Sequence, residues 1–175
     1  MAVVALRCVF VALVLRAAAA DEETRATTGC ELVLQRSATT TMVCAWAAFG
    51  PMPSARDGAP ALLQLAPDEE GLSGHHLCDE PEPGAFAGAV VLALRGECGF
   101  HQKALHAQHG GALALVVGHN ADGAPPVRMR SAATDAGAGG ARGVRVPCAM
   151  ISKADAQALV DEFGRRTPNN APKAQ

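Results

Sequence analysis

Two short apolar runs with a helix-like segment between them constrain the fold of this chain more than any other feature. The runs are AVVLAL at residues 89–94 and ALALVV at residues 112–117. Each run is continuous rather than alternating, which is typical of a strand that is buried on both faces. The intervening FHQKALHAQHG carries good helix formers and is followed by a second glycine, an ordinary helix stop. We therefore expect a strand–turn–helix–strand unit with parallel strands and a right-handed crossover.

The segments around this unit predict further strands and a second helix. CELVLQRSATTTMVCAW reads as a hairpin of two short strands around a polar turn, and ALLQLAP and VRVPCAMIS each predict one more strand. KADAQALVDEF predicts a short helix with Ser152 as its N-cap. Residues 118–143 are rich in Gly and Ala and lack hydrophobic periodicity, so we expect a mobile surface loop there. The chain as a whole is expected to be an α/β domain.

The first twenty residues predict a secretory signal peptide. An apolar core from Cys8 to Leu15 follows Arg7, and small residues at 17–20 supply a cleavage site before Asp21. A membrane anchor is the alternative, but Arg7 and Arg16 leave fewer apolar residues between them than a spanning helix needs. The expected organisation is a signal peptide at 1–20, an acidic leader at 21–29, a folded domain at 30–163 and a disordered tail at 164–175.

Charge and hydropathy exclude two classes of partner. Without residues 1–20, which hold two arginines, 13 Lys and Arg stand against 17 Asp and Glu, a net charge of −4. This mild acidity, with no basic stripe, argues against nucleic acid as a partner. No later apolar run approaches the length of a membrane span. We expect a mature chain without a membrane span, secreted or held in the endomembrane lumen, including an endosome, lysosome or vacuole.

The cysteines predict disulfides in such an oxidising compartment. Five of the six lie after the signal segment, and an odd count leaves one unpaired. If the hairpin turn centres near Ser37, Cys30 and Cys44 fall opposite each other, at a distance that a disulfide can span. Cys78 and Cys98 flank one strand, which makes them the second favoured pair. Spacing alone leaves other pairings open.

Cys98 could instead be a reactive thiol. A helix N-terminus together with His101 or Lys103 could lower its pKa and make it a nucleophile. Four other cysteines in a secreted chain make the disulfide the simpler interpretation. The sequence has no G-x-S-x-G elbow either, so a serine hydrolase is not supported.

The histidines offer weak metal sites. His106 and His109 share a face of the predicted helix and could touch one metal ion, whereas His101 would not join them. No carboxylate within the helix and no H-E-x-x-H motif completes the site. We therefore expect no metal and no cofactor, and we expect these histidines to be solvated.

A second weak metal candidate is the pair His75 and His76 beside Asp79 and Glu80. The six histidines together permit a further hypothesis, which concerns the effect of pH. Below about pH 6 they would add positive charge, which could make a partner surface pH-dependent in an acidic organelle.

The central unit and the last strand resemble the protease-associated, or PA, domain. The residues that carry the resemblance lie in GAVVLALRGECGFHQKALHAQHGGALALVV and in VRVPCAMISKADAQALV. The matching positions are Arg95, Gly96, Cys98, Phe100, Lys103, Ala107, Gln108, Gly111, Ala112 and Pro147. The resemblance implies a PA domain over 30–163, built as a β-sandwich or open barrel with two or three short helices. Cys148 stands where the family usually has an aliphatic residue, which marks it as the unpaired cysteine.

Upstream, MVCAWAAFGPMP, LQL and HLC resemble the luminal PA region of signal-peptide-peptidase-like intramembrane aspartyl proteases. Those proteases carry their catalytic aspartates in transmembrane helices, for which these 175 residues show no motif. The resemblance therefore implies no catalytic residue here.

What it implies is a non-catalytic secreted or luminal module that binds a protein or peptide, such as a protease or its substrate. Its expected working surface is the loops at 118–145 and 67–84. The alternative is a luminal regulatory domain cut from such a membrane protease. A metal-binding protein or thiol enzyme is the third and weakest hypothesis.

Overall fold

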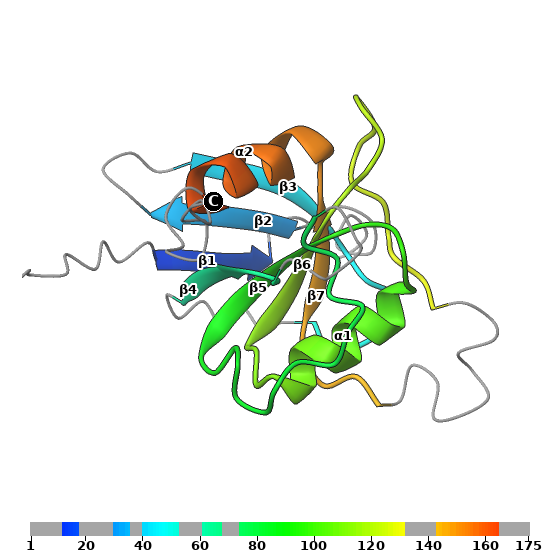
Figure 1. Cartoon of the computed structure of the whole chain (residues 1–175). Helices are drawn as coiled ribbons and strands as arrows, with labels where there is room; N and C mark the ends of the chain where they lie inside the picture. Colours follow the sequence, from blue (N-terminus) through cyan, green and yellow to red (C-terminus); the bar gives the residue numbers. More distant parts are fainter. Residues whose placement is uncertain are drawn as a thin grey trace, which may run out of the picture.

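Figure 1 shows the computed structural model, which describes residues 12–17, 30–35, 40–52, 61–67, 74–131 and 143–164. In this part of the chain, seven strands form one sheet in the order β1-β2-β3-β7-β6-β5-β4. The strands are β1 (Ala12–Ala17), β2 (Cys30–Gln35), β3 (Thr40–Trp46), β4 (Leu62–Leu65), β5 (Ala89–Leu94), β6 (Ala114–Gly118) and β7 (Cys148–Ile151). The helices are α1 (Phe100–His109) and α2 (Lys153–Gly164).

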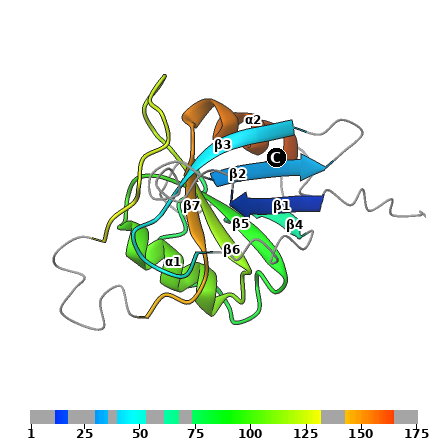
Figure 2. The ribbon, with the colours of Figure 1, turned by 180° about the vertical axis from the view of Figure 1, so that it is seen from behind.

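The strand–helix–strand unit predicted from the apolar runs is confirmed. Strands β4, β5, β6 and β7 are parallel neighbours. Alternate residues of β5 and β6 enter two separate cores: Leu92 and Val116 lie in the first, and Val91 and Leu115 in the second. Helix α2 contributes to the first core and α1 to the second, so both faces of the parallel strands are covered (Figures 1 and 2). Burial on both faces is the reason that the runs are continuously apolar.

The other strands complete an open barrel. Strands β1, β2 and β3 form an antiparallel ribbon that joins the parallel half through an antiparallel pairing of β3 with β7. The sheet curls until its two edge strands, β1 and β4, contact each other (Figure 2). The expected α/β class with an open barrel and a few short helices is therefore confirmed.

The first hairpin has the predicted register. Cys30 of β2 lies opposite Cys44 of β3, and a disulfide joins them. Both cysteines are 1% exposed and belong to the first core. The bond therefore crosses two paired strands inside the barrel.

Strand β1 lies within the segment that the sequence predicts to be a signal peptide. It pairs with β2 along its whole length, from Ala12 opposite Gln35 to Ala17 opposite Cys30. A leader that is removed cannot also supply the edge strand of the mature domain, so the two roles exclude each other. The signal peptide stays a prediction, and the acidic leader at 21–29 and residues 165–175 of the predicted tail lie outside the described residues. Within the described part, neither helix is long and apolar enough to cross a membrane.

The predicted surface loop is confirmed over residues 120–131, which are largely exposed and form neither helix nor strand, but it is anchored at one residue. Met129 is 1% exposed and lies in the second core. Its carbonyl oxygen accepts a hydrogen bond from the amide of Ala48 at 2.8 Å. A single anchoring side chain produces no periodicity in the sequence, which is why the segment looked unstructured. Residues 132–142 lie outside the described part.

Ser152 caps α2 as predicted. Its Oγ accepts a hydrogen bond from the amide of Asp155 at 3.1 Å and donates one to Oδ2 of the same residue at 2.7 Å. The cap satisfies one of the amides that the first turn of a helix leaves without a partner.

We expect Ser152→Ala to lower the free energy of unfolding by about 1 kcal/mol, because it removes this cap. Urea denaturation of the full chain measures the change. Gln157→Ala is the matched control, since it removes only an exposed side-chain pair with Asp161 on the same helix. A loss no larger for Ser152→Ala than for the control would show that the cap does not stabilise α2.

Candidate binding site at the Arg95 turn

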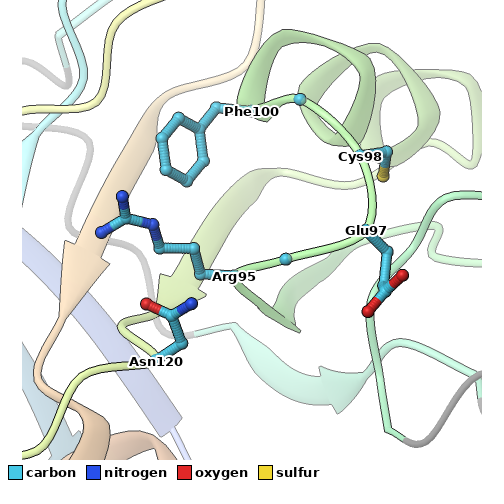
Figure 3. Close-up of a pocket in the computed structure, with 7 residues that line it drawn as sticks. Arg95, Glu97, Cys98, Phe100 and Asn120 are labelled. Atoms are coloured by element: carbon cyan, nitrogen blue, oxygen red, sulfur yellow. The ribbon is translucent and has the colours of Figure 1, made fainter.

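An open pocket of about 360 Å³ lies where β5 leads into α1. It is lined by the turn from Arg95 to Phe100 and by Asn120, which follows β6 (Figure 3). The register explains why these segments meet: Leu94 of β5 lies opposite Gly118 of β6. The residues that follow the two strands therefore emerge side by side at the carboxyl edge of the parallel sheet, which is a common place for ligand sites in such sheets.

The backbone of the turn adopts conformations that are rare for most residues. Gly96 has a φ of +126° and Glu97 a φ of +62°. The amide of Cys98 donates to the carbonyl of Gly96 at 2.7 Å, which closes a tight turn. Glu97 is exposed and tolerates the left-handed region at a cost of order 1 kcal/mol. The turn leaves the side chains of Arg95 and Phe100 on the same side of the pocket (Figure 3).

The guanidinium of Arg95 has two close neighbours. It lies 5.5 Å from the centroid of the Phe100 ring, a favourable cation–π distance. Its Nη1 lies 2.9 Å from Nε2 of His119. The main-chain amide of Arg95 also donates to the carbonyl of Gly118 at 2.9 Å. The side chain is thereby fixed at the pocket wall.

His119 faces hydrogen-bond donors on both ring nitrogens. The amide of Ala121 lies 2.9 Å from Nδ1, and the Arg95 guanidinium lies 2.9 Å from Nε2. Burial and the neighbouring Arg95 charge lower the pKa of His119, so the neutral ring is favoured. A neutral imidazole has one N–H and one lone pair. Whichever ring nitrogen carries the hydrogen, one of the two contacts is therefore a hydrogen bond. At the other contact the N–H group of His119 faces the N–H group of its neighbour.

The signature residues in α1 mostly hold the fold together. Lys103 and Ala107 are 0% exposed, whereas Gln108 reaches across to the chain that enters β7. Its Nε2 donates to the carbonyl of Gly143 at 3.2 Å, and its Oε1 accepts from the amide of Arg145 at 2.6 Å. Gln108 thus fixes the approach to β7 from the helix.

The remaining signature positions are also structural. Gly111 has a φ of +80° and lets the chain turn from α1 into β6. Ala112 is buried, and the carbonyl of Pro147 accepts a hydrogen bond from Leu115 in β6 at 2.9 Å. The turn from Arg95 to Phe100 is therefore the part of the signature that reaches the pocket.

The second disulfide joins Cys78 to Cys98, the pair that the flanking positions favoured. Cys98 is therefore not a free nucleophile in this structure. Cys148 carries the free thiol among the described residues. Burial raises the pKa of that thiol to about 12, so it stays protonated and unreactive at neutral pH.

The expectation of solvated helix histidines holds for His109 but is wrong for His101. His101 is 8% exposed and lies edge-on to Phe49, with ring centroids 6.0 Å apart. His76, from the second candidate pair, is also buried. The apolar period of α1 is too weak to show that this face points inward. His109 is exposed and lies 3.2 Å from Glu80.

No three His, Cys, Asp or Glu side chains of the described residues are placed to hold a metal ion together. His106 and His109 are accordingly not joined by a third ligand in this part of the chain. The proposed contribution of histidines to a pH-dependent surface stays a prediction.

His119 and Asn120 are the site residues that the sequence analysis missed individually, although they lie in the loop at 118–145 that it named. The signal that could have identified them is their position just after the second apolar run of the sequence, beside Arg95, which directly follows the first run. Arg95 itself was identified only as a signature residue without a binding role.

Known proteins bear out the fold. Residues 9–159 match the PA domain, and no curated protein matches the chain in sequence. A zinc aminopeptidase from Bacillus subtilis is similar in structure, with a TM-score of 0.53 and 23% identity over 71% of this chain and 26% of the enzyme. A peptidase M28 precursor from Shewanella amazonensis has a TM-score of 0.51 and 16% identity over 81% of this chain and 33% of that one.

The chain thus spans about a quarter to a third of the length of these two proteins, and at this level of identity the likeness concerns the fold alone. The family match covers most of the chain, from residue 9, inside the predicted signal segment, to residue 159 in α2. This chain belongs to the PA domain family.

Proposed function

We propose that this PA domain is a non-catalytic secreted or luminal module that binds a protein or peptide through oxygen atoms at the Arg95 turn. The supporting observation is that His119 faces two donors, the Arg95 guanidinium at Nε2 and the Ala121 amide at Nδ1, each 2.9 Å away. In the tautomer with the hydrogen on Nε2, a carbonyl or carboxylate oxygen of a ligand would accept from both Arg95 and His119 and relieve the opposition of their N–H groups. Charge-assisted hydrogen bonds of this kind are among the stronger ones in proteins.

The pocket suits an extended peptide better than a small metabolite. It is open and shallow, and the apolar ring of Phe100 stands beside the polar groups of Arg95 and Asn120 (Figure 3). A peptide offers such a surface both main-chain oxygens and apolar side chains. A protease or a protease substrate is the partner that the family resemblance suggests. Two disulfides favour an oxidising, non-cytosolic compartment.

A second proposal is that the domain regulates a larger peptidase of which it is one part. The observation in its favour is the small share of each structural neighbour that the chain covers. The upstream resemblance makes a signal-peptide-peptidase-like intramembrane protease one candidate parent. In that setting the Arg95 pocket would hold a segment of substrate rather than a separate partner.

The Arg95 proposal predicts a defined loss of affinity on substitution. The full chain would be used to select peptides from a random heptapeptide library, and the selected peptides would then be titrated against each variant. We expect Arg95→Gln to weaken binding by about tenfold or more, because removing a charged donor costs about 1.5–3 kcal/mol. Arg95→Lys should give a smaller loss of affinity, since lysine keeps the positive charge but lacks the planar guanidinium that can donate two parallel hydrogen bonds.

Arg130→Gln is the control, because it removes the same charge from an exposed position outside the pocket. We expect it to change affinity by less than about twofold. Equal affinity of the selected peptides for the wild-type chain and for Arg95→Gln would refute the site. Failure to enrich any peptide would refute the function.

A further inference from the structure

We propose that the Cys78–Cys98 disulfide is a thiol-exchange site, opened by a small thiol of the glutathione class, in which Lys103 stabilises the departing Cys98 thiolate. This inference goes beyond peptide binding, and only its consequence for the pocket rests on the proposed function. It is carried by the surroundings of Lys103, by the backbone at both cysteines and by their exposure.

Lys103 places a cation against the two sulfur atoms from inside the domain. The side chain is 0% exposed. Its Nζ lies 3.3 Å from Sγ of Cys98 and 3.6 Å from Sγ of Cys78, and it donates a hydrogen bond to the carbonyl of His76. A protonated amine has three hydrogens to donate, and these three acceptors lie within its reach. The geometry therefore fits an ammonium group that is directed at the disulfide.

The backbone next to each cysteine is held in the left-handed region. Leu77, which precedes Cys78, has a φ of +60°, and Glu97, which precedes Cys98, has a φ of +62°. Such conformations are unfavourable in residues other than glycine and persist only where the surrounding structure enforces them. Opening the bond frees Cys98 to relax with the turn that follows Glu97, which favours the reduced form.

The two disulfides of the domain differ in their surroundings. Cys78 and Cys98 are both partly exposed, and Cys98 lines the pocket. Cys30 and Cys44 are 1% exposed and lie between paired strands. A thiol from solution therefore has access to the first bond and not to the second. The buried pair is a control within the same molecule.

The exchange is balanced with two equivalents of the external thiol. A thiolate attacks Sγ of Cys78, a sulfur–sulfur bond forms between them, and the Cys78–Cys98 bond breaks. The electron pair leaves on Sγ of Cys98, which is the sulfur nearer to Lys103 and hence the better leaving group. A second thiolate then attacks the external sulfur of the mixed disulfide. Cys78 is released as a thiolate that takes a proton from solvent, and the external thiol leaves as its own disulfide.

Burial acts against the Lys103 cation, because it disfavours the thiolate and raises the pKa of a cysteine. The two influences on Cys98 can be compared. Burial alone raises the pKa of the Cys148 thiol to about 12. Cys98 is only partly buried, and the ammonium group of Lys103 lies 3.3 Å from its Sγ. An opposite charge at this distance favours the charged form of an acid, whereas the neighbouring carboxylates of Glu97 and Asp79 are exposed and screened by solvent. We therefore expect the cation to stabilise the Cys98 thiolate and with it the reduced form.

Opening the bond would change the binding pocket. The disulfide fixes Cys98 in the turn that also carries Arg95 and Phe100. Without it, the turn from Gly96 to Gly99 loses its link to the segment around Cys78. We expect amide hydrogen exchange in this turn to become faster on reduction. The peptides selected for the Arg95 pocket should then bind the reduced chain less tightly.

The wild-type chain tests the proposal directly. It would be equilibrated with reduced and oxidised glutathione at pH 6, 7 and 8, quenched with acid, alkylated and mapped by mass spectrometry. We expect the equilibrium constant for reduction of Cys78–Cys98 to exceed that of Cys30–Cys44 by about tenfold or more at pH 8. It should also rise between pH 6 and pH 8, as Cys98 ionises, while that of Cys30–Cys44 stays constant. Equal equilibrium constants for the two disulfides, or a constant for Cys78–Cys98 that does not change with pH, would overturn the proposal.

Lys103→Met tests the role of the cation. It should lower the constant for Cys78–Cys98 at pH 8 by about tenfold and abolish its rise with pH. Gln102→Met is the control, because Gln102 is exposed and bonds only the carbonyl of Cys78, at 3.1 Å. An unchanged constant in a folded Lys103→Met variant would refute the role of Lys103. If that variant does not fold, the wild-type pH profile decides. Both readouts are independent of peptide binding, so a failure of the proposed function would not be mistaken for a failure here.

Discussion

Replacing both Cys30 and Cys44 with alanine is expected to lower the free energy of unfolding by about 3 kcal/mol or more. The bond closes a loop with a sequence separation of 14 residues. In the chain-entropy model, removing a cross-link of this size returns about 3 kcal/mol of conformational freedom to the unfolded chain. The two sulfur atoms also leave the first core, where both cysteines are 1% exposed, so lost packing adds to the effect.

Urea denaturation of the full chain without reductant measures this loss. Cys148→Ala is the control, because Cys148 is equally buried at 1% but makes no cross-link. We expect it to cost about 1 kcal/mol through packing alone. A loss from the double substitution that is no greater than the loss from Cys148→Ala would show that the cross-link does not stabilise the barrel.

The central strands and this hairpin could be predicted because their signals are local. A run such as residues 89–94 is apolar at every position since the sheet is covered on both faces. The hairpin register follows from counting outward from a polar turn, and that count alone set Cys30 opposite Cys44. The N-cap at Ser152 is a local signal of the same kind.

The candidate site could not be predicted in full, because its contacts join residues that are distant in the chain. Arg95 and His119 are 24 residues apart, and only the parallel register of β5 and β6 brings them together. The buried state of Lys103 depends on a carbonyl and a sulfur 27 and 25 residues before it. The sequence allows Lys103 to be a buried pairing partner, as it allows Arg95 to be one, but a lysine on a weakly amphipathic helix does not reveal which distant atoms it will bind.

Strand β1 shows a different limit, because one sequence pattern supports two roles. An apolar stretch with small residues after it is the pattern of a signal peptide, and residues 12–17 of that stretch form a regular antiparallel partner for β2. Hydropathy shows only that the segment is apolar. It does not distinguish a translocation signal from the edge of a barrel.

The contact between β6 and α2 carries the second of the two largest expected effects. Gly118 ends β6, and an added Cβ there would lie 2.4 Å from Cβ of Ala156 in α2 and 3.1 Å from Cδ2 of Leu94. Carbon atoms in contact normally stay about 3.5–4.0 Å apart. We expect Gly118→Ala to lower the free energy of unfolding by about 3 kcal/mol, because neither the strand nor the helix backbone can move without disturbing the core between them.

A second substitution identifies the cause. Ala156→Gly removes the atom with which the new methyl group would collide, and it costs about 1 kcal/mol by itself in a helix. If the collision is responsible, the double variant is more stable than the sum of the two single losses allows, with a coupling energy of about 1–2 kcal/mol. Gly143→Ala is the control, since its added Cβ meets Leu105 at an ordinary 3.6 Å. If the two losses add strictly, α2 is free to shift away from the new methyl group. The amide of Arg95 donates to the carbonyl of Gly118 at 2.9 Å, so this result would also show that Gly118 is not a rigid support for Arg95.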